Sequence, residues 1–307
     1  MNRPSSAIAT WSMLFSVSIA AGAVAQAPVP AGATVDRDLV FAKFEKQKLS
    51  LDLYRPRQRT GKLPVVVWIY GGAWMQRNKS SQAPTATWLT SDGYAVAAID
   101  YRLSSEAQFP AQIIDCKAAV RWLRANADRL GLDADHIGVW GASSGGHLAS
   151  LVGLTRGHAV FYGDALAPED SSQVQAVVDY FGPTDFRQMD AHALPGAPFK
   201  HDAPDSPESR LVGGAIQQNA EKVERANPIE YVTKDAPPFF IAHGEVDPLV
   251  PYNQSELLFE ALRKAGADVT FYKVAGAGHG TKEFGSDVMR GAVRAFFDKY
   301  LKPASRR

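Results

Sequence analysis

The residues best suited to chemistry are a serine between glycines, in the segment Gly141-Ala142-Ser143-Ser144-Gly145. An apolar run over residues 136–140 precedes this G-x-S-x-G motif as a strand would, and small residues follow it as a helix would. A serine on a tight turn between a strand and a helix has its hydroxyl clear of the backbone, where it can act as a nucleophile. The motif alone also fits a glycine-rich helix start that binds an anion, so the assignment of Ser143 depends on its partners.

A serine hydroxyl is a poor nucleophile at neutral pH, so it needs a general base and a carboxylate that orients the base. After a strand–turn–helix motif of this kind, the expected chain order is serine, acid, histidine. His279 is the candidate base, because it follows the last predicted strand and has a glycine on each side. Four other histidines are expected to pack locally, to lie in the helix after the motif, or to lie on the surface: His147, His192, His201 and His243.

Asp247 is the candidate carboxylate, because it follows the penultimate predicted strand in a loop that two prolines stiffen. Glu245 in the same loop is an alternative, and so is Asp185, which also follows a predicted strand. Asp185 fits the cap of a turn or helix equally well. The chain order favours Asp247.

Acyl transfer to a serine also needs hydrogen-bond donors for the oxyanion that develops on the attacked carbonyl. One donor is expected from the backbone N–H of Ser144, directly after the nucleophile. The amides of Gly72 and Ala73 are expected to supply others, because glycines after the apolar run at residues 63–70 let the backbone turn into the site. Trp74, which comes next, is expected to shape the pocket.

The hydrophobic pattern predicts the elements that position these residues. Apolar or alternating runs predict strands over residues 35–43, 48–54, 63–70, 93–101, 136–140, 174–181, 237–242 and 269–274. Helical spacing predicts helices over residues 110–130, 144–151, 255–265 and 287–301. This alternation indicates an α/β protein with a mostly parallel eight-stranded sheet, helices on both faces and a site at the carboxyl ends of the strands.

Residues 186–228 interrupt this alternation and include a polar helical stretch near residues 207–226. The segment is long for a connection, so we expect a small cap over the carboxyl edge of the sheet. A surface excursion without function is the alternative.

The amino end is expected to lie outside the fold. A basic residue, a short apolar stretch and a small-x-small triplet predict a signal peptide, residues 1–25, cleaved near Ala25. An uncleaved anchor or a disordered tail is the alternative. A linker over residues 26–34 then precedes one domain over residues 35–302, so we expect a secreted or periplasmic protein with no membrane span.

The composition is that of a globular protein, with 46% hydrophobic and 21% charged residues. Removal of residues 1–25 leaves 32 basic and 32 acidic residues, which gives no bias toward nucleic acid or an anionic membrane. Cys116 is the single cysteine, which excludes an internal disulfide, and its apolar neighbours predict a buried thiol. The sequence shows no metal-ligand cluster, dinucleotide fingerprint or phosphate-binding loop, so we expect no metal and no cofactor.

Together these motifs resemble the α/β-hydrolase superfamily over residues 35–302, and within it the hormone-sensitive-lipase-like esterases. The resemblance is closest to the bifunctional acetylxylan/feruloyl esterase-like subgroup, and it lies in residues 100–103, 109–115, 139–149, 180–185 and 243–251. It implies a serine esterase that forms an acyl-enzyme. The implied substrates are small or polymer-attached esters, such as acetyl or feruloyl esters of plant polysaccharide.

Two positions of the oxyanion loop depart from the family's pattern. Ala73 stands where glycine is common, which can narrow the site or change its donors. Tyr70 stands where the oxyanion loop usually begins with a histidine, which supports that loop and does not attack the substrate. Tyr70 can still hydrogen-bond through its hydroxyl. We therefore treat Tyr70 and Trp74 as candidate contacts of the substrate.

Two other functions remain open from the sequence. A serine peptidase of the oligopeptidase kind shares the strand–turn–helix motif around the serine (the serine elbow) and a similar loop around the acid (the acid loop). Such enzymes usually carry a large extra domain, and a chain of 307 residues is expected to hold a single domain. A non-catalytic binding protein on this fold usually lacks a member of the triad, whereas Ser143, Asp247 and His279 are all present. The sequence therefore favours an ester hydrolase.

Overall fold

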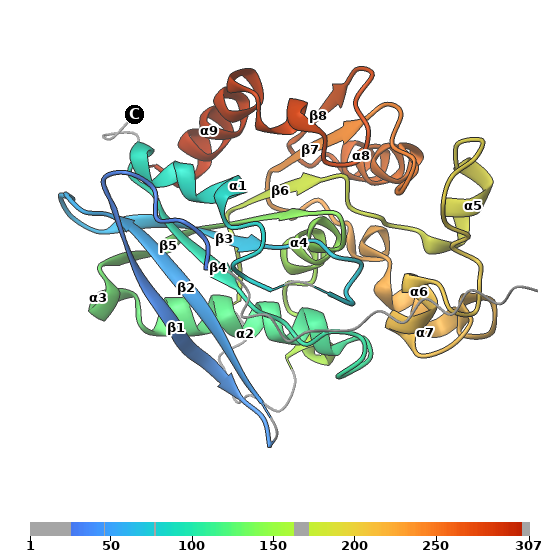
Figure 1. Ribbon diagram of the computed structural model, residues 1–307, viewed down its shortest axis with the longest axis horizontal. Helices are drawn as coiled ribbons and strands as arrows, with labels where there is room; N and C mark the ends of the chain where they lie inside the picture. Colours follow the sequence, from blue (N-terminus) through green and yellow to red (C-terminus); the bar gives the residue numbers. More distant parts are fainter. Residues whose placement is uncertain (1–25, 46, 77, 163–171, 303–307) are drawn as a thin grey trace, which may run out of the picture.

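The computed structural model describes residues 26–45, 47–76, 78–162 and 172–302, so the predicted signal peptide lies outside the described residues. An eight-stranded sheet with the order β1-β2-β4-β3-β5-β6-β7-β8 runs through the centre (Figure 1). β1 pairs antiparallel with β2, and β2 pairs antiparallel with β4. The other neighbours all pair parallel. The predicted α/β-hydrolase architecture is confirmed.

Each predicted strand corresponds to a strand of this sheet. The bounds are β1 Ala33–Lys43, β2 Lys48–Pro56, β3 Leu63–Ile69, β4 Ala95–Ile99, β5 Leu132–Ala142, β6 Ala176–Tyr180, β7 Phe239–Gly244 and β8 Val269–Val274. Every residue of β3, β4, β6 and β7 is buried, because helices cover both faces of the sheet. This explains why these strands read as continuous apolar runs and not as alternating ones.

Alternate residues of each strand feed two separate cores. In β3, Val65, Val67 and Ile69 face one core, whereas Val66 and Trp68 face the other. Helices α2 (Ala111–Ala125), α4 (Ser144–Leu154) and α8 (Asn253–Ala265) cover the first core. Helices α1 (Pro84–Thr87) and α9 (Asp287–Leu301) cover the second. In Figure 1, α2 and α9 accordingly lie on opposite sides of the sheet.

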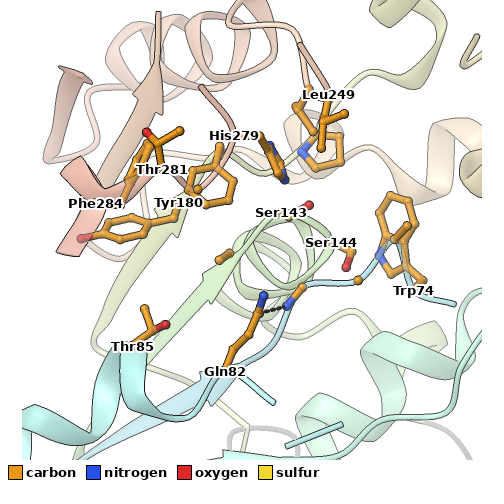
Figure 2. A pocket seen from close by; sticks show the side chains of 18 of the residues that line it. Trp74, Gln82, Thr85, Ser143, Ser144, Tyr180, Leu249, His279, Thr281 and Phe284 are labelled. Atoms are coloured by element: carbon orange, nitrogen blue, oxygen red, sulfur yellow. Dashed lines mark hydrogen bonds between the residues drawn. The ribbon is translucent and has the colours of Figure 1, made fainter. Parts of the chain in front are cut away.

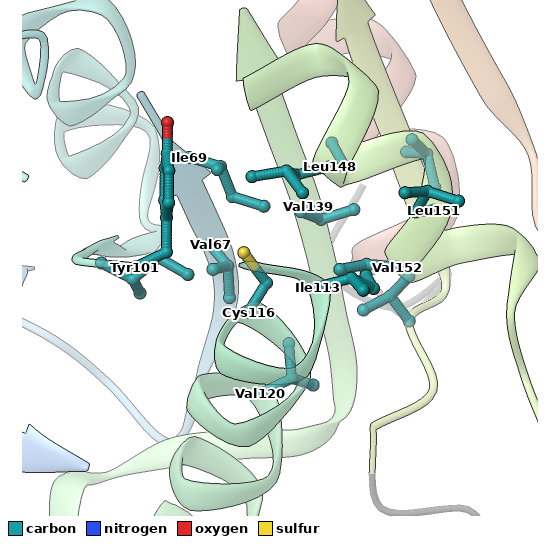
Figure 3. Packing of buried hydrophobic residues seen from close by; sticks show 14 of the residues in the cluster. Val67, Ile69, Tyr101, Ile113, Cys116, Val120, Val139, Leu148, Leu151 and Val152 are labelled. Carbon is teal, nitrogen blue, oxygen red and sulfur yellow. The ribbon is translucent and has the colours of Figure 1, made fainter. Parts of the chain in front are cut away.

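Cys116 lies inside the first core, as the sequence predicted. Figure 3 shows it on α2 among Val67, Ile113 and Val139. The side chain is fully buried, and this burial raises the pKa of the thiol well above its usual value. The cysteine therefore has a packing role and stays a neutral thiol.

Two helical segments outside residues 186–228 differ from the prediction. The helix predicted over residues 110–130 ends at Ala125, and a short helix, α3 (Ala127–Leu130), follows it. Asn126 separates them with φ −103° and ψ 8°, and its side-chain amide donates to the Trp122 carbonyl, in competition with the helical hydrogen bonds. The second difference is α1 and the 3₁₀ helix Trp88–Asp92, in a stretch for which the sequence predicted no element.

Residues 186–228, which we call the cap, form short helices joined by turns. They include α5 (Met189–His192), α6 (Pro207–Val212) and α7 (Ala220–Ala226). The polar helical stretch expected near residues 207–226 is split, because Gly213 adopts φ 83° and ends α6. In Figure 1 the cap helices lie on the side toward which the arrows of β3 and β6 point, that is, at the carboxyl edge of the sheet.

Candidate active site

Ser143 stands on a sharp turn between β5 and α4. Its backbone has φ 56° and ψ −125°, a conformation that a residue with a side chain adopts only where its surroundings enforce it. The Ser143 N–H donates to the Tyr180 carbonyl at 2.8 Å, which ties the turn to the end of β6. Ser143 lines a pocket at the carboxyl edge of the sheet.

The glycines around Ser143 are required by close backbone contacts. A β-carbon on Gly141 would lie 2.0 Å from the Gly145 carbonyl oxygen. A β-carbon on Gly145 would lie 2.1 Å from the carbonyl oxygen of Ile69, at the end of β3. Only glycine fits at these two positions, so the G-x-S-x-G pattern follows from the close approach of α4 to β3 and β5.

His279 and Asp247 meet although 32 positions separate them in the chain. The Nδ1 of His279 lies 2.7 Å from the Oδ2 of Asp247. The other oxygen of Asp247, Oδ1, accepts the backbone N–H groups of Leu249 at 2.8 Å and Val250 at 2.9 Å. In Figure 2 the His279 ring lies beside Ser143, and both residues line the same pocket. The structure therefore brings the three predicted triad residues to one place.

His243 lies buried beneath the loop that carries Asp247. Its Nε2 is 2.9 Å from the Val250 carbonyl oxygen and 3.4 Å from Asp247 Oδ2, and its Nδ1 is 2.7 Å from Ser255 Oγ. Burial raises the pKa of Asp247, but the contacts with His243 and His279 outweigh it, so this pKa lies well below its usual range. Asp247 is thus an ionised carboxylate at neutral pH, able to orient the His279 ring and to stabilise its protonated form.

The two alternative carboxylates are engaged elsewhere. Glu245 forms an ion pair with Lys273 and accepts the backbone N–H of Gly276 at 3.3 Å. Asp185 accepts the backbone N–H of Arg187 at 3.1 Å and caps a turn, which is the other role that the sequence allowed for it. Neither contacts the His279 ring, so among the three candidates the structure brings Asp247 to the base.

The loop after β3 has the backbone geometry that an oxyanion hole needs. Gly72, Ala73 and Trp74 all have positive φ, at 141°, 55° and 56°. The preceding amide, that of Gly71, donates to Gln82 Oε1 at 2.8 Å, the contact drawn as a dashed line in Figure 2. Within the described part of the chain, the amides of Gly72, Ala73 and Ser144 have no hydrogen-bond partner, and all three residues line the pocket. These are the three donors that the sequence predicted.

Tyr70 does not reach the pocket, which corrects its assignment as a candidate substrate contact. Its ring is buried and stacks on Tyr101, with centroids 4.4 Å apart and planes at 14°. The Tyr70 hydroxyl donates to the Tyr101 carbonyl at 3.5 Å, and the Tyr101 hydroxyl donates to the Tyr70 carbonyl at 3.2 Å. The side chain therefore supports the start of the oxyanion loop from the core. Trp74, by contrast, lines the pocket as predicted.

The pocket has a volume of about 660 Å³ and extends to both sides of Ser143. Figure 2 shows Trp74, Ser144 and Leu249 on one side, and Thr85, Tyr180 and Phe284 on the other. His201 of the cap interacts with the Leu249 backbone and contacts Glu208. We call the first side, together with this pair, the cap arm: Trp74, Ser144, His201, Glu208 and Leu249. We call the second side the aromatic arm: Thr85, Trp88, Tyr180, Phe284 and Arg290.

The cap arm contains two residues that the sequence analysis missed. His201 was expected on the surface, but only 4% of it is exposed, and its Nδ1 lies 3.1 Å from Oε1 of the equally buried Glu208. Nothing in the local sequence marks this pair, because the cap lacks a regular hydrophobic period.

Among the described residues, no group of three or more His, Cys, Asp or Glu side chains could hold a metal ion, and no helix is long and apolar enough to cross a bilayer.

Comparison with known proteins gives this arrangement a family. The family model BD-FAE matches residues 51–262, which span both the oxyanion loop and the serine elbow. The chain belongs to the BD-FAE family. This confirms the family resemblance that the motifs indicated.

Relatives of this BD-FAE chain are named as esterases. It is 34% identical to Esterase LipC of Mycobacterium tuberculosis over 75% of this chain and 56% of that protein. It is 32% identical to a truncated carbohydrate esterase from gut microbiota, with a TM-score of 0.78 over 89% of this chain and 99% of that one. A bifunctional GH43-CE protein of Bacteroides eggerthii is 38% identical, with a TM-score of 0.76 over 86% of this chain and 35% of that one. The chain spans about half the length of the curated relatives that it matches first.

Proposed function

We propose that this chain is a serine carboxylic ester hydrolase in which Ser143, His279 and Asp247 form the catalytic triad. The observation that carries the proposal is the 2.7 Å contact between Asp247 and His279 beside a serine held on a strained turn. The names of the esterase relatives support the same reaction class.

The reaction proceeds in two halves. His279 takes the proton of the Ser143 hydroxyl as its oxygen attacks the ester carbonyl carbon, and the amides of Gly72, Ala73 and Ser144 bind the resulting oxyanion. The protonated His279 then gives its proton to the departing alcohol, which leaves an acyl group on Ser143. Water, activated by His279 in the same way, releases the carboxylic acid. Asp247 remains ionised throughout.

We propose acetyl or feruloyl esters of plant polysaccharide, or other short-chain esters, as the substrates. The printed descriptions of two similar structures, a carbohydrate esterase and a GH43-CE protein, support this class. The open pocket with arms on both sides of Ser143 has room for an ester whose alcohol belongs to a larger molecule.

The activity can be tested with a panel of matched esters. It would contain p-nitrophenyl acetate, butyrate and octanoate, methyl ferulate and acetylated xylan, with Ser143→Ala as the blank. Turnover of acetylated xylan or methyl ferulate that Ser143→Ala abolishes is the expected result. Rates equal to those of the blank on all five substrates would contradict the proposal.

We further propose export of the protein after cleavage near Ala25. The support is the leader-like pattern of residues 1–25. Expression of the full chain in a Gram-negative host, followed by cell fractionation and intact-mass measurement, tests this directly. A cytoplasmic product that keeps residues 1–25 would contradict it.

A further inference from the structure

The cap arm of the pocket holds polar atoms without protein partners. In the part of the chain that the structure describes, three pocket-lining side chains have a buried polar atom with no hydrogen-bond partner: Trp74 Nε1, Ser144 Oγ and Glu208 Oε2. Each of these residues is more than nine-tenths buried. Buried polar groups are normally paired, because an unpaired one has lost its hydrogen bonds to water and has formed none within the protein. Three along one wall of the pocket indicate a ligand that supplies the missing partners.

Glu208 is held firmly enough to act as a fixed acceptor. Its Oε1 lies 3.1 Å from His201 Nδ1, and the His201 ring also interacts with the backbone of Leu249 in the acid loop. Behind the ring, the His201 backbone N–H donates to Asp190 Oδ1 at 2.9 Å. Burial lowers the pKa of His201, but Glu208 and the weaker contributions of Asp190 and Leu249 outweigh it and raise this pKa. One oxygen of Glu208 is thus occupied by His201, while Oε2 is left without a donor.

The types of these groups define the chemistry of the missing partner. An ionised carboxylate only accepts hydrogen bonds, an indole N–H only donates, and a serine hydroxyl does both. A molecule with several hydroxyl groups meets all three requirements, because each hydroxyl is both donor and acceptor. An anion would be repelled by Glu208, and an alkyl chain would leave every one of these atoms unpaired.

We propose that Glu208, positioned by His201, is a specificity-determining residue that binds hydroxyl groups of the substrate's alcohol portion. The enzyme then favours esters of polyhydroxylated alcohols over esters of simple alcohols. A short acyl group such as acetyl has no hydroxyl, so the donors to Glu208 come from the alcohol. This inference rests on the proposed function, since it concerns the substrate of the same Ser143 site.

The test compares two acetate esters of equal chain length, glycerol 1-acetate with two free hydroxyls and propyl acetate with none. The full chain is assayed for release of acetic acid from each, and the ratio of the two kcat/KM values is the readout. Because a hydrogen bond to a charged group changes affinity by about tenfold or more, the unmodified protein should favour glycerol 1-acetate by about that factor. Glu208→Leu should bring the ratio close to one, and Glu208→Gln, which keeps an acceptor and the shape, should lie between.

The matched control is Glu224→Gln, which removes an exposed carboxylate on α7 outside the pocket and should leave both rates unchanged. If Glu208→Leu lowered both rates by the same factor, Glu208 would be structural and the inference overturned. An unmodified protein that hydrolyses both esters equally fast would overturn it as well, with the proposed function intact. Absence of Ser143-dependent hydrolysis of either ester would contradict the proposed function itself.

Discussion

Ser143, Asp247 and His279 follow the ends of β5, β7 and β8, and backbone contacts fix the turns that present them. The cap reaches the same pocket from short helices and turns, and two of the residues that it contributes, His201 and Glu208, are held by each other and by Asp190. Backbone contacts at the sheet edge tolerate little change, whereas the cap pair depends on side chains that a single substitution can change. We infer that the sheet edge determines the chemistry and the cap determines which ester reaches it.

After loss of Ser143 itself, the largest effect on turnover is expected from Asp247→Asn, a substitution at the sheet edge. The asparagine keeps the acceptor for the Leu249 and Val250 amides but turns a donor toward His279, which then carries its proton on the wrong nitrogen. We expect kcat/KM for propyl acetate to fall on the order of 10⁴-fold with the fold intact. Glu245→Gln, two residues earlier in the same loop, should change it by less than about threefold, since an exposed ion pair contributes little. Equal losses in both variants would assign the effect to the loop and not to the carboxylate.

The next largest effect is on stability and comes from the glycines that let α4 approach β3. In Gly145→Ala the new methyl group would meet the Ile69 carbonyl oxygen at 2.1 Å, so the helix or the strand must shift. We expect the free energy of unfolding in urea to fall by about 3 kcal/mol. Gly291→Ala on α9 is the control, because its β-carbon meets nothing within 4 Å and helix propensity gains roughly 0.5–1 kcal/mol. A stability loss as small as that of an ordinary surface substitution would show that α4 and β3 can move apart at the sheet edge at little cost.

A smaller effect is expected where the oxyanion loop depends on a side chain. Gln82→Leu removes the acceptor of the Gly71 amide, and the neighbouring amides of Gly72 and Ala73 then lose their fixed direction. Because those amides act on charge that develops during the reaction, kcat should fall about ten- to hundredfold while KM changes little. Steady-state kinetics on propyl acetate measures the split. A rise in KM at constant kcat would instead mean that Gln82 contacts bound substrate.

The same contrast explains what the sequence could predict. The triad followed from local patterns, because a serine, an acid and a histidine that each come after a strand of a parallel sheet must meet at one edge. The pairing of His201 with Glu208 could not be predicted, since it depends on how short cap helices pack and no hydrophobic period records that packing. The break at Asn126 was also missed, because the helical spacing continues through it while its side chain competes for the Trp122 carbonyl.

Tyr70 shows most clearly the difference between what a local sequence pattern predicts and what tertiary packing decides. The prediction that it begins the oxyanion loop was correct, and the prediction that it contacts the substrate was wrong. The direction of its ring is set by Tyr101, which comes 31 residues later and stacks on it at 4.4 Å. Tyr70→Phe keeps the stack and removes only a long hydrogen bond, so kcat/KM should stay within about twofold and stability within about 1 kcal/mol. Tyr70→Ala removes the stack as well and should cost about 3–5 kcal/mol of stability, measured by urea unfolding. A hydroxyl that reached the substrate would give the opposite pattern, with Tyr70→Phe raising KM at unchanged stability.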